Sequence, residues 1–206
     1  MLEAADLECE RGGRTVFRRL SFSLAPGELL RVAGANGSGK TSLLRMLCGL
    51  LAPSGGEVRW QGTAIERLRE EYSRQLVYLG HAPAVKDDLT AEENLSISCS
   101  LSAIPWTKKA VRAALERFGL AGKEGEPVRR LSQGQRRRSA LARLCLSEAV
   151  PLWLLDEPFS ALDAAGVALL RTLIDAQVKR GAIVVYSTHQ DPGMEAARVV
   201  ELGAAS

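Results

Sequence analysis

An eight-residue run near the start of the chain matches the phosphate-binding pattern G-x-x-x-x-G-K-[S/T], and no other feature constrains the fold as strongly. Glycines allow left-handed backbone angles and place no Cβ between the main chain and a ligand. Several N–H groups can therefore point at a chain of phosphates. In this pattern the lysine faces the β- and γ-phosphates, and the next hydroxyl can ligate Mg²⁺. The run comprises Gly34, Ala35, Asn36, Gly37, Ser38, Gly39, Lys40 and Thr41.

The residues around this run support the functional interpretation over a glycine-rich turn that binds nothing. The pattern is meaningful only between a strand and a helix. Residues 28–33 are short and mostly apolar, and they follow a Pro26–Gly27 turn signal. After the run, leucines recur at helical spacing until Gly49, which suits a helix stop. The sequence therefore predicts a nucleotide-binding loop at a helix N-terminus, with Ser42 as a further binding residue.

The bulk composition fits one domain, with room for a small inserted lobe. The chain has 206 residues, of which 46% are hydrophobic and 25% charged, and a net charge of +3 that demands no nucleic acid. The first six residues lack the apolar region of a secretion signal, and the longest apolar run, near Val150–Leu155, is too short to span a membrane. We therefore expect a soluble chain, for which any membrane role requires a partner. Four widely spaced cysteines favour small buried side chains over a zinc site or disulfides.

Strand patterns and helix patterns alternate at both ends of the chain, whereas the middle is helical. Alternating or continuous apolar segments predict the strands, and capping residues followed by apolar periodicity predict the helices. The expected strands are 7–10, 20–24, 28–33, 56–62, 76–79, 152–155 and 182–187, and the expected helices follow Thr90, Thr107, Ser132 (to about Glu148) and residue 163. This order predicts a parallel α/β core, residues 1–80 and 149–206, with a helical insertion at about 82–148.

Two carboxylates follow the most apolar strand. Asp156 and Glu157 come directly after Leu152–Leu155, at the strand edge where open α/β sheets place ligands. We expect Asp156 to hold the Mg²⁺ of the nucleotide and Glu157 to polarise the attacking water. The alternative is a strand end with a polar turn, which the upstream phosphate loop makes less favourable.

The run Leu131-Ser132-Gln133-Gly134-Gln135 resembles the signature of ATP-binding cassette (ABC) ATPases, usually Leu-Ser-Gly-Gly-Gln. Ser132 also stands 24 positions before Asp156, as in that family. The resemblance implies that Ser132, Gln133, Gly134 and Gln135 contact the γ-phosphate held by a second cassette, so that two copies sandwich two ATP molecules. Gln133 departs mildly from the usual glycine. An ordinary serine helix cap is the alternative role for Ser132.

Further positions extend this resemblance over essentially the whole chain. Ser160 and Asp163 match the dimer-contact loop of the family, and His189 matches its switch histidine, which bonds the γ-phosphate. Without this context, His189 would be an ordinary surface histidine. The family implies a P-loop NTPase (RecA-like) parallel core, an antiparallel β subdomain and a helical ABC-specific insertion.

Two positions depart from the family pattern. His81 stands where a glutamine usually reports the state of the γ-phosphate to the transport partner. We expect His81 to act there as a neutral hydrogen-bonding group of a coupling loop, against the alternative of simple loop packing. Arg11 stands where an aromatic residue often stacks on adenine, and its guanidinium can also stack on a base or remain solvated.

A basic run, Arg136–Arg138, follows the signature. Cations at a helix start are unfavourable to the helix dipole. A phosphate or acidic partner nearby would offset this, although a solvated face is the interpretation that the run favours by itself.

The resemblance is narrower to the ATPases of bacterial cytochrome c maturation systems, carried by Gly80–His81, Leu89–Leu95, Leu141–Leu144 and Leu152–Phe159. It implies ATP and Mg²⁺ as cofactors and ATP hydrolysis coupled to transport. It also implies a homodimer on the cytoplasmic face of the inner membrane, an integral membrane permease-like partner, and haem export or release of a haem-loaded chaperone. The alternatives are an ABC ATPase for another substrate and a non-transport ABC protein acting on nucleic acid or ribosomes. The single cassette, without zinc spacing or long heptads, disfavours the latter.

Overall fold

Five parallel strands form the central sheet in this computed structural model, which describes residues 1–189 and 193–203. The remaining six residues fall in the predicted core range 149–206 and lie outside the described part. The sheet order is β6 (Leu76–Leu79), β7 (Leu152–Leu155), β8 (Ile183–Thr188), β3 (Leu29–Ala33) and β9 (Arg198–Glu201). Strands β7 and β8 are buried along their whole length, as predicted for central parallel strands.

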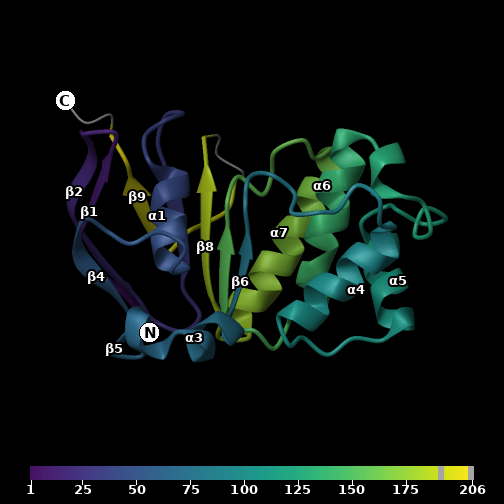
Figure 1. The fold of residues 1–206 in the computed structure, drawn as a ribbon, viewed down its shortest axis with the longest axis horizontal. Coiled ribbons are helices and arrows are strands. Elements are labelled where there is room, and N and C mark those ends of the chain that lie inside the picture. Colours follow the sequence, from purple (N-terminus) through teal and green to yellow (C-terminus); the bar gives the residue numbers. More distant parts are fainter. Residues whose placement is uncertain (190–192, 204–206) are drawn as a thin grey trace. The chain divides into compact units, whose positions relative to one another are not determined.

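A second, antiparallel sheet belongs to the same unit. Its order is β2 (Arg14–Leu24), β1 (Leu2–Arg11), β4 (Gly55–Trp60) and β5 (Thr63–Ala64). The helix α1 (Lys40–Leu47) lies between the two sheets (Figure 1) and contacts both. Leu43, Leu44 and Leu47 of α1 join one hydrophobic core with side chains of both sheets. Two short helices, α2 (Ile65–Leu68) and α3 (Glu70–Arg74), follow β5.

The start of β1 shows how a bulge hides a strand from a sequence pattern. Leu2 and Ala4 are buried, and so are Leu7 and Cys9, so the buried parity changes within the strand. The pairing with β2 shifts register between Ala4 and Leu7, where Asp6 has a φ of 48°. The alternation therefore predicted only residues 7–10 of a strand that begins at Leu2.

The chain divides into two units, each described here by itself. The first comprises Met1–His81, Val150–Pro158 and Ala176–Ser206, and the second comprises Ala82–Ala149 and Phe159–Asp175. The second unit holds α4 (Ala91–Leu101), α5 (Lys108–Arg117), the 3₁₀ helices η1 (Val128–Arg130) and η2 (Ala142–Leu146), α6 (Gln133–Leu141) and most of α7 (Ala164–Lys179). No helix among the described residues is long and apolar enough to cross a membrane.

Three of the predicted caps are present in the second unit. Thr90 and Glu93 form a reciprocal capping box at α4, Thr107 caps α5, and Ser132 caps α6. The helix predicted from Ser132 to about Glu148 is shorter than expected, because α6 ends at Leu141 and the chain continues as η2. The tighter 3₁₀ turn is common at helix ends, and here Leu141, Ala142 and Leu144 are all buried. With these elements in place, the predicted fold class is confirmed: a parallel α/β core, an antiparallel sheet and a helical insertion.

All four cysteines are free thiols. Burial raises the pKa of the Cys48 thiol to about 11 and raises the pKa of Cys9, Cys99 and Cys145 as well. A raised pKa lowers the thiolate fraction at neutral pH, and the thiolate is the reactive form. The cysteines therefore fit a packing role.

The core of the first unit can be tested by truncating a leucine. Leu44 is fully buried in α1, whereas Leu50 is 68% exposed just after that helix. Leu44→Ala should lower the free energy of unfolding by about 2–5 kcal/mol, because it leaves a cavity between the sheets. Leu50→Ala should change it by less than about 0.5 kcal/mol. Urea unfolding followed by tryptophan fluorescence measures both, and equal losses would contradict this description of the core.

Candidate functional site

The phosphate loop lies between β3 and α1, as the sequence predicted. Gly39 is the N-cap of α1 with a φ of 101°, and Gly34 has a φ of 147°. A Cβ on Gly39 would lie 2.4 Å from Cγ1 of Val16, and a Cβ on Gly34 would lie 2.5 Å from the carbonyl oxygen of Leu202. Both positions therefore require glycine for the backbone conformation and for the close packing around the loop.

Lys40 folds back across the loop that precedes it. Its Nζ donates hydrogen bonds to the carbonyl oxygens of Gly34, at 2.7 Å, and Ala35, at 3.1 Å. The same ammonium lies 3.6 Å from Oε1 of Glu157, and only 6% of Lys40 is exposed. A cation held over a ring of N–H groups at a helix N-terminus forms an anion site.

Asp156 connects three elements at the carboxyl ends of β7 and β8. Its Oδ2 accepts a hydrogen bond from Oγ1 of Thr41 at 2.8 Å, and its Oδ1 accepts one from Oγ of Ser187 at 2.6 Å. Asp156 is fully buried, so these hydroxyl donors compensate for the desolvation of the carboxylate. The two residues predicted to hold Mg²⁺, Thr41 and Asp156, are thus in direct contact.

Glu157 is held by its main chain and by two side chains. Its N–H donates to Oγ of Ser187 at 2.9 Å, and its φ of 48° is left-handed. Its Oε2 lies 3.0 Å from Nδ1 of His189, which is half exposed. A left-handed backbone conformation is strained for a residue other than glycine, and such strained residues are found mostly at functional sites. The predicted catalytic pair, Glu157 and His189, therefore forms one unit beside Lys40.

A cavity of about 520 Å³ opens onto these groups, a size suited to a small-molecule ligand. Its lining combines most of the predicted residues with Val16 and Arg45, which the sequence did not indicate. The predicted residues Gly34, Ala35, Ser38 and Asp156 do not line it. The lining residues are Arg11, Val16, Asn36, Gly37, Gly39, Lys40, Thr41, Ser42, Arg45, His81, Glu157 and His189.

Several features of this cavity fit a nucleotide with Mg²⁺. The glycine cradle leaves no side chain between the loop backbone and a phosphate. Oγ of Ser38 is buried in the loop without a hydrogen-bond partner in the protein, so a phosphate oxygen could serve as its acceptor. Mg²⁺ usually keeps water and substrate phosphates as ligands and needs only one or two protein oxygens. Thr41 and Asp156 can supply these.

The signature and the dimer-contact loop lie in the second unit and are described by themselves. Oγ of Ser132 accepts from the N–H of Gln135 at 3.3 Å, and Oε1 of Gln135 accepts from the N–H of Ser132 at 3.0 Å. Ser132 and Gln133 are exposed. A Cβ on Gly134 would lie 3.2 Å from the carbonyl oxygen of Ala161, so the signature helix packs closely against the loop that contains Ser160.

Asp163, at the other end of the dimer-contact loop, also contacts the signature helix. Its Oδ1 accepts from the N–H of Gly166 at 2.8 Å, and its Oδ2 accepts from Nη1 of Arg138 at 3.4 Å. The two predicted motifs of the second unit are thus in mutual contact.

Sequence reasoning missed Ser187, Val16 and Arg45. Ser187 is a fully buried hydroxyl near the end of a strand that begins with three apolar residues, and this buried polarity was the available signal. Val16 belongs to β2 of the antiparallel sheet and packs against Gly39 of the phosphate loop. No local sequence pattern indicates that contact.

Together, the strand, loop and helix with the acidic strand end define a P-loop nucleotide-binding domain. Comparison with known proteins narrows this class. The profile of the family described as ABC transporter matches residues 17–160. The cytochrome c biogenesis ATP-binding export protein CcmA of Nitrosomonas europaea is 50% identical over 202 residues, 98% of this chain and 94% of that protein. The protein of the same name from Aromatoleum aromaticum is 53% identical over 191 residues, 93% and 89% of the two chains.

A solved structure supports the fold. It is a dimeric ATP-binding cassette in a post-hydrolysis state, bound to ADP and Pi, with a TM-score of 0.82 at 22% identity over 100% of this chain and 97% of that one. The chain belongs to the ABC transporter family and, within it, to the CcmA group of cytochrome c biogenesis ATP-binding export proteins. The resemblance inferred from the sequence is confirmed at both levels.

The role of Lys40 can be tested by its removal. Lys40→Ala should weaken ATP binding about 10- to 100-fold, because hydrogen bonds to charged groups contribute about 1.5–3 kcal/mol. Lys179→Ala, at an exposed helix end, is the matched control and should bind like the wild type. Isothermal calorimetry measures both affinities. Near-normal binding by folded Lys40→Ala would refute the phosphate-loop assignment.

Proposed function

We propose that this chain binds and hydrolyses ATP as the nucleotide-binding subunit of a membrane-associated ABC complex for cytochrome c biogenesis. The observation that carries the proposal is the convergence of Lys40, Thr41, Asp156, Glu157 and His189 at one end of the parallel strands. The names of the relatives at about 50% identity support the biological assignment.

The phosphate loop binds and orients the substrate. The N–H groups of residues 34–41 and the ammonium of Lys40 hold the β- and γ-phosphates of ATP. Lys40 exchanges its present carbonyl acceptors for phosphate oxygens, a stronger charge-assisted interaction. Arg11 lines the cavity, and its guanidinium stacks on the base. Thr41 and Asp156 would hold Mg²⁺, which would supply positive charge to the phosphate oxygens.

Glu157 and His189 act on the attacking water. The Glu157 carboxylate orients this water and accepts its proton while the water oxygen bonds to the γ-phosphorus and the bond to the β-phosphate oxygen breaks. ADP and inorganic phosphate are the products. Glu157 anchors the His189 ring through Nδ1, so Nε2 is the ring nitrogen that faces the γ-phosphate. Ser187 fixes the main chain of Glu157 and so maintains this geometry.

Removing the carboxylate separates binding from hydrolysis. Glu157→Gln should bind ATP as the wild type does, but hydrolyse it about 10²–10⁴-fold more slowly, because the amide cannot accept a proton. Glu148→Gln, outside the site, is the control. Phosphate release in steady state measures the rates. Normal hydrolysis by Glu157→Gln would remove it from the role of general base.

A second copy of the chain completes each site in this proposal. Ser132, Gln133, Gly134 and Gln135 of one copy contact the γ-phosphate bound by the phosphate loop of the other, and Ser160 and Asp163 contact the partner copy. The exposed position of Ser132 and Gln133 at the N-terminus of α6 supports this, because the positive end of a helix dipole favours an anion. A C₂ dimer with two equivalent composite sites follows.

The membrane partner is an integral permease-like subunit, and the dimer binds it peripherally at the cytoplasmic face of the inner membrane. ATP hydrolysis then energises haem export or the release of a haem-loaded chaperone. His81 lines the nucleotide cavity and begins the chain segment that leads into the second unit, which supports a coupling role. Nucleic acid is not a proposed partner.

The biological assignment is tested in a mild detergent extract. The tagged chain should co-purify with an integral membrane subunit and a haem-binding chaperone, which mass spectrometry identifies.

The coupling role of His81 is tested in the reconstituted complex. His81→Ala should leave ATP binding nearly unchanged but should uncouple ATP hydrolysis from chaperone release, which a release assay measures alongside the ATPase rate. A permease for another substrate would replace the cytochrome c assignment with the alternative transporter, and normal coupling in His81→Ala would reduce His81 to loop packing.

A further inference from the structure

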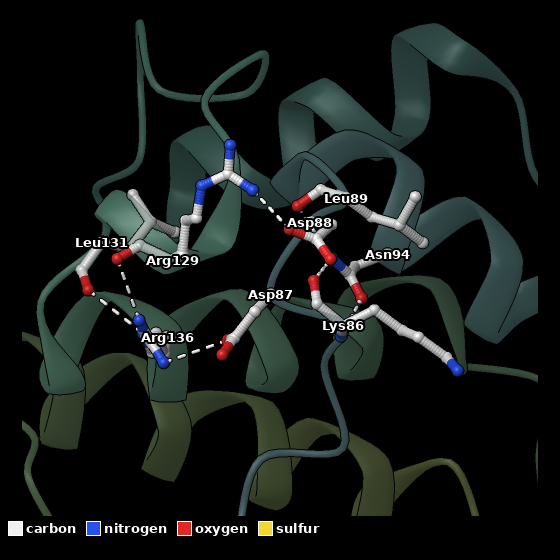
Figure 2. A network of polar contacts seen from close by, with 8 residues as sticks. All are labelled: Lys86, Asp87, Asp88, Leu89, Asn94, Arg129, Leu131 and Arg136. Atoms are coloured by element: carbon white, nitrogen blue, oxygen red, sulfur yellow. Dashed lines mark hydrogen bonds and ion pairs between the residues drawn. The ribbon is translucent and has the colours of Figure 1, made fainter.

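Arg136 lies at a junction in the second unit, next to the signature. Its Nε donates to the carbonyl oxygen of Leu131 at 3.2 Å, and its Nη2 donates to that of Arg129 at 2.9 Å. Its Nη1 donates to Oδ1 of Asp87 at 3.0 Å (Figure 2). Leu131 immediately precedes Ser132. One side chain thus holds the backbone that leads into the signature and a carboxylate 49 positions earlier in the chain.

The segment that contains Asp87 is itself fixed. Asn94, only 8% exposed, accepts a hydrogen bond from the N–H of Lys86 at 2.7 Å and donates to the carbonyl oxygens of Lys86 and Leu89 (Figure 2). The N–H of Arg129 also donates to the carbonyl oxygen of Asp87 at 3.0 Å. The main chain at Asp87 is therefore held in place, and from it the carboxylate reaches Arg136.

The surroundings of Arg136 differ from those of a neighbouring ion pair. The Asp87–Arg136 pair has side-chain exposures of 61% and 32%, whereas Asp88 and Arg129, which also form an ion pair, are 88% and 55% exposed. Exposed pairs contribute little. Arg136 also donates to two backbone carbonyls, so its position is set by three interactions. Asp87 supplies the acidic partner that the basic run at the start of α6 calls for.

We propose that Arg136, held by Asp87, is a positioning residue that sets the place of Ser132 and thereby links the segment 86–89 to the γ-phosphate contact in the partner copy. We name Asp87, Asn94 and Arg136 the signature clamp. Segment 86–89 follows His81 by five residues in the chain. A displacement of this segment, by a membrane partner or by nucleotide, pulls on Arg136 and shifts the start of the signature. This inference rests on the proposed function, because it requires a signature that acts on ATP.

The first test compares single variants. Arg136→Met keeps the aliphatic stem but removes all donors, and it should lower kcat about 10- to 100-fold, because small displacements of a contacting group cost that much. The ATP affinity of the isolated chain should not change, because the phosphate loop is intact. Arg136→Lys, which keeps the charge facing Asp87, should regain part of the rate. Asp87→Ala should lower kcat less, and Asp88→Ala should stay within about twofold of the wild type.

The second test asks whether the defect belongs to the signature. A mixed dimer of Arg136→Met and Lys40→Ala keeps one intact site, formed by Lys40 of the first chain and the signature of the second. A mixed dimer of Arg136→Met and Ser132→Arg keeps none. ATP-dependent dimerisation and hydrolysis should therefore be restored in the first mixture and not in the second. The mixture of Ser132→Arg with Lys40→Ala is the positive control.

The outcomes separate the two hypotheses. Restoration with Lys40→Ala alone supports the signature clamp. The signature clamp is overturned if activity is restored with both partners or with neither. It is also overturned if Arg136→Met has the kcat of the wild type. In each of these cases the proposed function stands. If the wild type hydrolyses no ATP, the proposed function fails. If only the positive control fails, the composite site fails, and the clamp fails with it. Thermal unfolding of each variant checks that a lost rate is not a lost fold.

Discussion

The buried carboxylate of Asp156 is the constraint on which the nucleotide site depends. An ionised carboxylate with no exposure is costly unless strong donors meet it, and here the hydroxyls of Thr41 and Ser187 do so from α1 and β8. The main-chain N–H of Asp156 also donates to the carbonyl oxygen of Leu79 at 2.8 Å, next to β6. One residue therefore ties the phosphate-loop helix to three neighbouring strands. The four residues of β7 are all apolar and buried, so the first position for a polar side chain lies just after the strand. The Asp156 carboxylate therefore lies at the carboxyl end of the sheet, where open α/β sheets bind ligands.

Much of this arrangement could be predicted from the sequence because its motifs are local. Gly34–Thr41 and the Asp156–Glu157 pair each occupy consecutive positions, and each has a chemistry that follows from residue type alone. Ser187 escaped prediction because a serine near the end of a mostly apolar strand resembles a tolerated polar residue. Its importance appears only when β7 and β8 pair and place its hydroxyl between the Asp156 carboxylate and the Glu157 N–H. The roles of Arg11 and His81 remain predictions, although both residues line the cavity.

The fold was predictable where periodicity is regular and was missed where tertiary packing changes it. The bulge at Asp6 reverses the buried parity of β1, and the 3₁₀ segment Ala142–Leu146 tightens what the pattern described as one helix. Strand β9 is four residues long and mostly exposed, so it lacks the apolar signal by which a strand is recognised. The signature clamp could not be predicted for the same reason, because tertiary packing creates its contacts. Arg136 and Asp87 are far apart in the chain, and only the folded second unit turns an unfavourable basic run into a partnered one.

The hydroxyl of the signature serine can combine its structural role as a helix cap with the functional role proposed for it. As a helix cap, Oγ of Ser132 accepts a hydrogen bond from the Gln135 N–H, which uses a lone pair. The hydroxyl proton is not consumed by that bond, and a hydroxyl can donate once while it accepts. In the proposed composite site, a phosphate oxygen accepts a hydrogen bond from this hydroxyl, while the cap keeps the serine at the start of α6. The carbonyl of Leu131, held by Arg136, then decides where this cap lies. Orientation by the helix and location by the clamp are separate contributions, so a variant can lose one and keep a well-formed α6.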